Sequence, residues 1–419
     1  GIDLGRDLRR GPGIGAIVDV EDQRQPRGAR ALEPGKGGAA RRLGGKDGAR
    51  GDQRVVACVI HGGDIRNRIA LTKARSAIAI DGGGGDNDIR IGSMARPGES
   101  DGSTLETVRG EITVTGNGSA GERLTLDATG TGRDLAGEIG AARIAGFGMA
   151  GGVSFSGLGQ VALILGSGDD IVTADAVASG TTLDVDLGAG ADSATAGSAG
   201  DLSGIAGTLR LTGGADGDRL VMDSTAQAGS GILSSDGGGE GRLSGFGMGE
   251  DLRFGTFEDV RLRLSDGDDA LHVAGTLASA DTLVRLGGGA DTVGLGYDPD
   301  VTGSALSALA GPLEIIGSAG AADLVEVGAG TPADLTVDTL AGATRVTPRG
   351  LPGVELIGLS PDSTLRLDLS GGGDTLDVRD STLTVDARLR GGDDTMTVSG
   401  AGQDVTAYLG AGARDSLTV

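Results

Sequence analysis

The stretch Leu163-Ile164-Leu165-Gly166-Ser167-Gly168-Asp169-Asp170-Ile171-Val172 joins two short aliphatic segments through a glycine-rich turn that ends in two acids. Related stretches, each running from a leucine to an aspartate, recur at 187–192, 286–291, 369–374 and 389–394. A strand–turn–strand element that recurs this often indicates a stacked array of repeats.

A longer period lies above these turns. The segment Gly146-Phe147-Gly148-Met149 recurs 99 residues later at 245–248, and Asp170 and Asp192 recur at the same offset as Asp269 and Asp291. A looser third copy places the equivalent acids at Asp374 and Asp394. We therefore predict a repeat array over residues 78–419 with units near 112–198, 209–296 and 313–400, each of about four coils.

The segments between turns alternate in polarity. Residues 260–264 and 365–369 place aliphatic side chains on one face and charged ones on the other, as half-buried strands do. A lone hairpin is marginal in water, whereas stacked coils bury one continuous aliphatic column. The pattern predicts an all-β fold, a parallel β-solenoid of stacked strand–turn–strand coils resembling a β-helix or β-roll. Tandem β-sandwich domains, one per unit, fit the unit length equally well.

Composition narrows the choice of core and partner. The chain holds 84 glycines in 419 residues, only 2% aromatic residues and no tryptophan, which excludes an aromatic-cored globule. A hydrophobic content of 38% argues against simple disorder. The net charge of −23 argues against nucleic acid or an anionic membrane as partner of the repeat array, and favours cations. No apolar run is long enough to predict a membrane span.

The first part of the chain is different. Residues 1–80 hold 16 Lys and Arg against 9 Asp and Glu, and all three lysines of the chain lie there. Residues 1–77 are interpreted either as a basic, disordered arm or as sequence translated out of its native frame. The single cysteine, Cys58, excludes an intrachain disulfide. The absence of an initial Met and the end at Val419, directly after a turn, suggest part of a longer protein.

The turns carry oxygen ligands for a hard cation. Glycine reaches positive φ, which lets carbonyl groups point into a turn, and the following Asp adds a carboxylate. Calcium prefers six to eight such oxygens. Coils stacked ~4.8 Å apart would also bring like charges together, at a cost of roughly 0.9 kcal/mol per pair in water and roughly 3–4 kcal/mol at a dielectric constant near 20. The predicted metal ligands are Asp88, Gly166, Gly168, Asp169, Asp170, Gly188, Gly190, Asp192, Asp218, Asp268, Asp269, Gly287, Gly289, Asp291, Asp374, Asp393, Asp394 and Asp415.

These turns resemble degenerate calcium-binding nonapeptides of the repeats-in-toxin class, whose pattern is G-G-x-G-x-D-x-U-x with U a large aliphatic residue. The positions that match its second, fourth, sixth and eighth places are Gly166, Gly168, Asp170 and Val172, and again Gly287, Gly289, Asp291 and Val293. The longer unit is similar to strand repeats of very large secreted or surface-attached bacterial proteins. The resemblance implies secretion, calcium loading and an extended shape. Because acidic turns come only about every 20–26 residues, we expect one edge at most to carry a row of calcium ions.

Catalytic groups are sparse in the array. His272, Tyr297 and Tyr408 are isolated, and paired acids such as Asp169 and Asp170 recur in several coils, which favours a structural role over one acid–base pair.

The sequence therefore predicts a non-catalytic, calcium-binding segment of a secreted or cell-surface bacterial protein, a stalk or adhesin-like scaffold. Its expected partners are calcium ions and either cell-surface glycans or neighbouring repeats of a longer chain. The alternative is a carbohydrate-binding or carbohydrate-processing β-solenoid, with Phe147, Phe155, Phe254 and Phe257 either stacking on sugars or filling the core.

Overall fold

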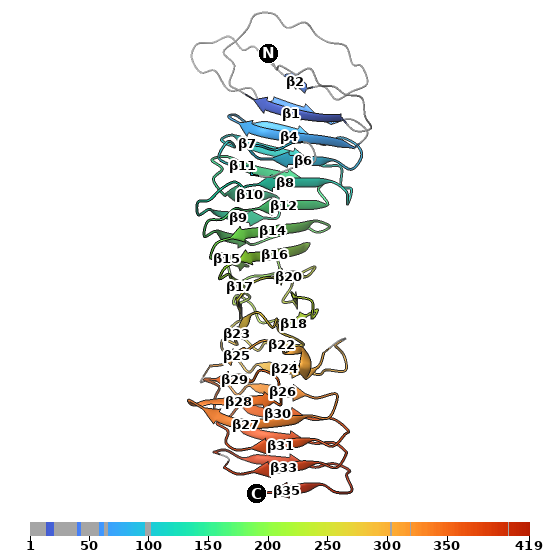
Figure 1. Cartoon of the computed structure of the whole chain (residues 1–419), viewed down its shortest axis with the longest axis vertical. Helices are drawn as coiled ribbons and strands as arrows, with labels where there is room; N and C mark the ends of the chain where they lie inside the picture. Colours follow the sequence, from blue (N-terminus) through green and yellow to red (C-terminus); the bar gives the residue numbers. More distant parts are fainter. Residues whose placement is uncertain are drawn as a thin grey trace, which may run out of the picture. The chain divides into compact units, whose positions relative to one another are not determined.

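The structure, a computed structural model, describes residues 14–20, 40–42, 58–62, 66–96, 102–301, 304–318, 320–400 and 402–419. These residues form strands and turns, with one short 3-10 turn, η1 (Leu306–Ala308), and no α-helix. The chain divides into unit 1, residues 1–193 and 205–216, and unit 2, residues 194–204 and 217–419. Each unit is a parallel β-solenoid whose coils alternate between two sheets, A and B (Figure 1).

Unit 1 contains two sheets, and within each sheet nearly every strand pairs with a strand of the next coil. Sheet A contains, in spatial order, β1 (Ile14–Val20), β4 (Asn67–Ala74), β6 (Asp88–Ile91), β8 (Arg123–Asp127), β12 (Gln160–Ile164), β14 (Thr182–Ala189) and β16 (Thr208–Ala215), all parallel. Sheet B contains β2 (Ala40–Arg42), β3 (Cys58–His61), β5 (Ile78–Asp81), β7 (Glu111–Thr115), β11 (Gly152–Ser156), β10 (Arg143–Gly146), β9 (Ala136–Gly140) and β13 (Ile171–Ala174). The division between the units falls within β15 (Ser193–Ala196).

Unit 2 follows the same plan. Its sheet A contains β20 (Leu252–Gly255), β19 (Glu240–Gly245), β18 (Ser230–Ser235), β22 (Ala270–Val273), β24 (Thr292–Gly296), β26 (Leu324–Gly328), β30 (Thr364–Asp368), β32 (Thr384–Arg388) and β34 (Val405–Tyr408). Its sheet B contains β17 (Arg219–Asp223), β21 (Asp259–Arg263), β23 (Asp281–Arg285), β25 (Leu313–Ile316), β29 (Val354–Ile357), β28 (Ala343–Pro348), β27 (Asp334–Leu340), β31 (Thr375–Val378), β33 (Thr395–Val398) and β35 (Ser416–Thr418).

The core is the aliphatic column that the alternation predicts. Leu124, Val161, Leu183 and Leu209 occupy one register position on β8, β12, β14 and β16, and all four are buried. Burial of each such side chain stabilises the stack by about 1.5–3 kcal/mol relative to exposure. The parallel solenoid is therefore confirmed. The tandem β-sandwich alternative is wrong, because the strands pair in parallel with successive coils instead of forming antiparallel sheets.

The change in charge along the sequence predicts that the repeat array begins at residue 78. Strand pairing begins earlier in the chain. β3 pairs with β5 and β4 pairs with β6, both in parallel. Most of residues 1–57 lie outside the described ranges, and so do the interpretations of that segment as disordered or out of frame.

We call each passage of the chain through one of the two sheets a crossing. Most crossings are single strands, but one in each repeat is a three-stranded antiparallel meander: β9–β10–β11 in unit 1, and β18–β19–β20 and β27–β28–β29 in unit 2. The Gly-Phe-Gly-Met segments form the turns after β10 and β19. Phe147 and Phe246 there have φ of 51° and 48°, and their rings are buried. Each ring lies against a strand glycine, Gly137 or Gly231.

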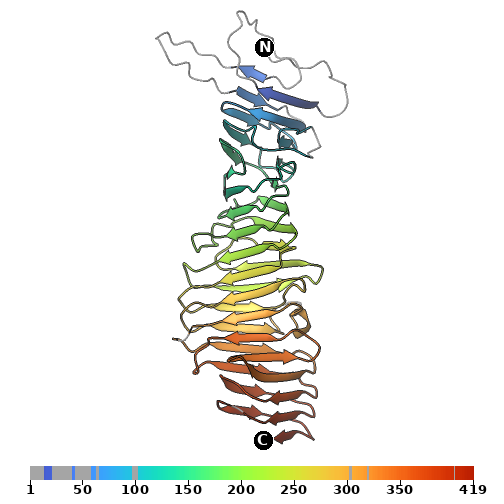
Figure 2. The same cartoon turned by 60° about the vertical axis from the view of Figure 1, so that its left-hand side comes forward.

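The meander changes the number of coils in a repeat. In unit 2 the repeat near 313–400 crosses between sheets as β25, β26, the meander, β30, β31, β32 and β33, which is seven crossings, or three and a half coils. The expected number of about four coils is therefore half a coil too high for this repeat, because the three strands of a meander make only one crossing. With an odd number, the two meanders of unit 2 lie in opposite sheets, A and then B. Figure 2 shows the two sheets from a second side.

We predict that Gly231→Ala destabilises the protein by about 1–3 kcal/mol, because the new Cβ would lie 2.2 Å from Cε2 of Phe246 and the buried ring must move. Gly371→Ala is the matched control, since no atom lies within 4 Å of its added Cβ. Urea unfolding of both variants measures the difference, and equal midpoints would contradict the packing role of Gly231.

Candidate functional site: the aspartate turns

The last acid of each turn points inward and the acid before it points outward. Asp170, Asp269 and Asp394 are buried, whereas Asp169, Asp268 and Asp393 are exposed. Asp192, Asp218, Asp291 and Asp374 are also buried, and Asp415 is partly buried. The predicted register of these acids is therefore present within each unit.

The buried acids form hydrogen-bonded columns at the coil edges. In unit 1 the N–H of Leu135 donates to Asp170 Oδ1 at 2.7 Å, and the N–H of Asp170 donates to Asp192 Oδ1 at 2.6 Å. In unit 2 the N–H of Asp269 donates to Asp291 Oδ1 at 2.8 Å, and Asp291 N–H donates to Asp323 Oδ1 at 3.1 Å. Each Oδ1 therefore accepts the N–H of a preceding coil, a charge-assisted bond of about 1.5–3 kcal/mol.

The exposed acids bond in the other direction. Asp169 Oδ1 accepts the N–H of Ala191 at 2.9 Å, and Asp268 Oδ1 accepts that of Ala290 at 2.8 Å. Two acids thus clamp neighbouring turns reciprocally, each satisfying a backbone donor that stacking would otherwise leave without a partner.

The columns run along both edges of unit 2. The turn at Asp269 leads from sheet B to sheet A, whereas the turn at Asp374 leads from sheet A to sheet B. On the second edge, Asp374 N–H donates to Asp394 Oδ1 at 2.8 Å, and Asp394 N–H to Asp415 Oδ1 at 3.2 Å. The acidic turns of unit 2 are therefore not confined to one edge, because the odd number of crossings moves them from one edge to the other. Whether calcium ions follow them stays a prediction.

The turn glycines permit close stacking. A Cβ at Gly166 would lie 1.9 Å from the carbonyl oxygen of Thr131, and one at Gly168 would lie 2.2 Å from the carbonyl carbon of Arg133. Their equivalents are additionally in the left-handed region, with φ of 95°, 125°, 84° and 92° at Gly188, Gly190, Gly287 and Gly289. The carbonyl of Gly166 accepts the N–H of Ala189 at 2.9 Å, so it already has a partner in the neighbouring coil.

Asp88 lies outside these columns. Its carboxylate pairs with Arg90 at 3.1 Å, and the preceding residue, Asn87, takes the turn position. Asn87 N–H donates to Glu122 Oε2 at 2.6 Å, so an amide and a longer acid replace aspartate at this edge of unit 1. Asn87 is not among the predicted ligands, although it stands at the end of a glycine-rich turn, a position that indicates such a role.

The second carboxylate oxygen distinguishes two kinds of turn. At Asp269 the N–H and hydroxyl of Ser265 donate to Oδ2 at 3.0 and 2.8 Å, and Ser370 Oγ lies 3.2 Å from Asp374 Oδ2. Among the described residues, the buried Oδ2 atoms of Asp170, Asp291, Asp323 and Asp394 have no hydrogen-bond partner. Gly166 and Gly287 stand where Ser265 stands, so those turns lack the hydroxyl.

Burial of these carboxylates makes them hard to ionise. Burial, with the neighbouring charges of Asp192 and Asp134, raises the pKa of Asp170 to about 6, although the Leu135 N–H opposes the shift. Burial together with the charges of Asp323 and Asp269 raises the pKa of Asp291 to about 7. A proton or a cation at Oδ2 would relieve the same cost.

The donor set fits calcium only in part. The turns supply hard oxygen ligands, but nowhere in the described ranges do three Asp, Glu, His or Cys side chains converge closely enough to hold a metal ion. An ion at a turn would therefore take few carboxylates and depend on carbonyl groups and water for its remaining ligands.

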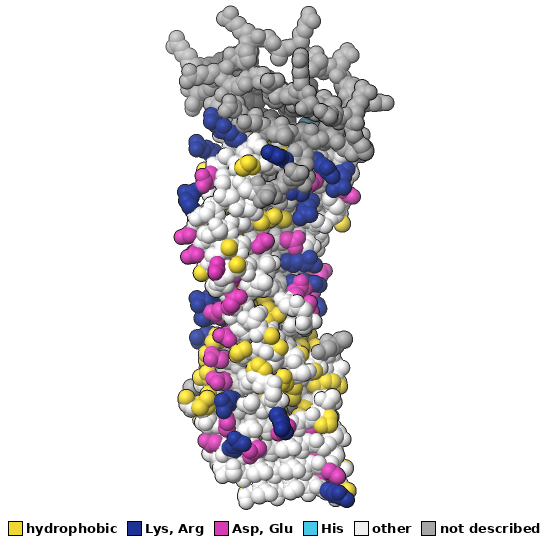
Figure 3. All heavy atoms as spheres, viewed as in Figure 1, with side chains coloured by type: hydrophobic (Ala, Val, Ile, Leu, Met, Phe, Trp, Pro, Cys, Tyr) yellow, Lys and Arg dark blue, Asp and Glu magenta, His cyan; other side chains and the backbone are white. Residues whose placement is uncertain are grey.

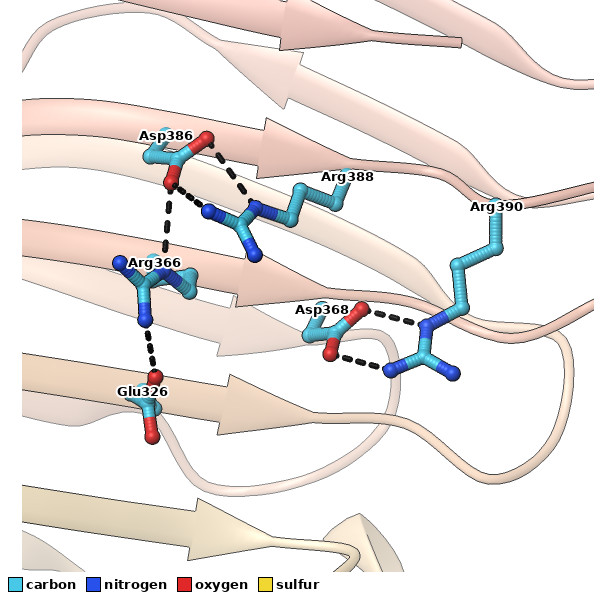
Figure 4. Close-up of polar contacts among 6 residues, drawn as sticks. All are labelled: Glu326, Arg366, Asp368, Asp386, Arg388 and Arg390. Atoms are coloured by element: carbon cyan, nitrogen blue, oxygen red, sulfur yellow. Dashed lines mark hydrogen bonds and ion pairs between the residues drawn. The ribbon is translucent and has the colours of Figure 1, made fainter. Parts of the chain in front are cut away.

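Acids on the outward strand faces are neutralised by arginine. Arg366 on β30 lies 2.5 Å from Glu326 and 3.2 Å from Asp386, and Arg388 lies 2.9 Å from Asp386 (Figure 4). Burial acts to raise the pKa of Asp386, but hydrogen bonds from Arg388 and Arg366 outweigh it and leave the pKa low. Asp368 pairs similarly with Arg390 (Figure 4). These acids are unsuited to cations.

The residues considered for catalysis and sugar stacking are dispersed. His272 is largely buried, 3.8 Å from Asp298, and burial lowers its pKa. Tyr297 and Tyr408 are exposed, and the five phenylalanines of the chain are all buried, which confirms their core-filling role.

No protein-family model matches the chain, and no curated protein matches it in sequence. The described part of the chain forms no helix of the length and apolarity needed to cross a bilayer.

We predict that Ser265→Ala destabilises the protein by about 1–3 kcal/mol, because it removes a hydroxyl donor from the buried Oδ2 of Asp269. Ser279→Ala is the control, since Ser279 is exposed. Thermal melts of the two variants at neutral pH measure the effect, and matching melting temperatures would argue against a structural role for this hydroxyl.

We also predict that Asp291 makes stability fall as pH rises. Its pKa is about 7 in the folded protein and 3.8 in the reference state, so the folded form holds the proton more tightly. Its contribution is therefore full below about pH 4 and is lost as pH rises through 7. Asp291→Asn should flatten the decline in melting temperature between pH 4 and 8, and Asp281→Asn, at an exposed site, should not. A pH series of melts tests this, and an unchanged slope in Asp291→Asn would refute it.

Proposed function

We propose that this chain is a non-catalytic repeat scaffold of a secreted or cell-surface bacterial protein, and that calcium stabilises its aspartate turns. The observation that carries the proposal is the set of buried Oδ2 atoms at Asp291, Asp323 and Asp394, which lack a hydrogen-bond partner among the described residues. A buried carboxylate oxygen without a donor is costly, and a bound cation would offset that cost.

The contacts of the recurring turn aspartates support the scaffold role. In the described residues the turn acids bond to backbone N–H groups of neighbouring coils, as Asp170 and Asp291 illustrate. Such bonds hold neighbouring coils in register, which is a structural role. Each further coil of a solenoid extends the stack by about 4.8 Å, which suits a spacer or stalk.

Weak calcium sites follow from the ligand supply. At Asp291, Asp323 and Asp394 the Oδ1 atom already accepts an N–H, so each of these acids offers an ion one oxygen, Oδ2. Calcium affinity decreases as the number of charged ligands decreases. We expect dissociation constants on the order of 10⁻⁴–10⁻³ M, the range of extracellular calcium modules. A protein tuned to that range would be loaded outside the cell and empty inside it.

We predict that millimolar calcium raises the melting temperature at pH 8, where the carboxylates would otherwise be ionised and unneutralised, and has less effect at pH 5, where protons occupy the same oxygens. Calorimetric melts with calcium, with magnesium and with chelator measure this. Asp291→Asn should reduce the calcium effect, whereas Asp281→Asn should preserve it.

Equal melting temperatures with calcium and with chelator at pH 8 would refute the calcium proposal. The fold would then depend on protonation or on hydrogen bonds alone. A calcium effect of equal size in Asp291→Asn would show that the ion binds elsewhere.

A further inference from the structure

A hollow of about 410 Å³ lies on unit 1 over the beginnings of β4, β6, β8 and β12. Its charged lining residues are four arginines, Arg66, Arg68, Arg90 and Arg123, and two acids, Asp86 and Asp88, and Gln160 adds an amide. Figure 3 shows dark blue side chains gathered over the beginnings of these strands, on the right of the upper part of the molecule. Four arginines thus surround one hollow in a chain whose net charge is −23.

Strand register sets the spacing of the charges. Arg68 stands opposite Asp88, Asp88 opposite Arg123, and Arg123 opposite Gln160 on successive strands. Strands lie about 4.8 Å apart, so Arg68 and Arg123 are roughly 9–10 Å apart along the sheet. Two guanidinium groups at that spacing can each hold a separate anionic group of one ligand.

Three of these arginines have no acidic partner among the residues that the structure describes. Among the described residues, Arg90 pairs with Asp88, whereas Arg66, Arg68 and Arg123 make no ion pair or side-chain hydrogen bond. Outward arginines of unit 2 such as Arg366 and Arg388 have carboxylate partners. Neighbouring cations around one hollow repel one another, and a bound anion would offset that repulsion.

The lining also indicates the class of anion. It holds no aromatic side chain, so it has no platform on which a nucleic-acid base could stack. It does hold Asp86 and Gln160, which can bond to hydroxyl groups; Asp86 already accepts such a bond from Ser119 Oγ. Guanidinium groups bind carboxylates in a bidentate manner. We propose that this hollow binds an acidic polysaccharide, with uronate carboxylates at Arg68 and Arg123 and sugar hydroxyls at Asp86 and Gln160.

The test is isothermal titration calorimetry of the whole protein with an oligogalacturonate in low-salt buffer. The buffer contains no calcium, so the result does not depend on the proposed calcium binding. We expect saturable binding that weakens as salt rises. Arg68→Gln and Arg123→Gln should each weaken it by about tenfold, because each removes one charge-assisted contact. Arg285→Gln, at an exposed strand position of unit 2, is the matched control and should bind like the parent. Circular dichroism confirms that each variant is folded.

Three parallel titrations define the ligand. A neutral oligosaccharide should not bind, and inorganic phosphate should bind far more weakly than the oligouronate. Single-stranded DNA should not compete. Absence of oligouronate binding, equal binding by Arg68→Gln and the parent, or stronger binding of DNA or phosphate at the same residues would each overturn the proposal.

Discussion

Stacked turns leave backbone N–H groups between coils, out of reach of water, and each needs an acceptor. The solenoid supplies one from a side chain of the next coil: Asp192 for the N–H of Asp170, and Asp291 for that of Asp269. The aliphatic column stabilises the stack without fixing how one turn faces the next. The acids do fix it, because a carboxylate reaches the donor only when the turns are in register.

The period of the acids and the alternation of the strands were sufficient to predict the fold class and the burial of positions such as Leu365 and Leu367. The number of coils per repeat was not predictable, because a segment of given length can form two crossings or one meander. The partner of each acid was not predictable either. A Gly-Asp turn is compatible with either carbonyl groups or N–H groups facing the carboxylate. Only the fold, which brings a neighbouring coil alongside, places the Leu135 N–H at Asp170.

Aspartates on the outward strand faces and aspartates in the turns at the coil edges differ in how their charge is compensated. On the strand faces arginine neutralises acids directly, as at Asp386, and keeps its pKa low. At the edges burial dominates and the pKa of Asp291 rises to about 7. The same residue type is therefore ionised at neutral pH on the strand faces, whereas at the edges it titrates near neutral pH. This difference links the stability of the turns to pH.

The odd number of crossings in the repeat near 313–400 has a consequence for recognition. A feature of one repeat, such as its meander, is displayed by the next copy in unit 2 from the other sheet. A partner that binds both meanders of unit 2 would have to contact a different sheet for each. Repeats that share one architecture can in this way present the same element from alternating sheets.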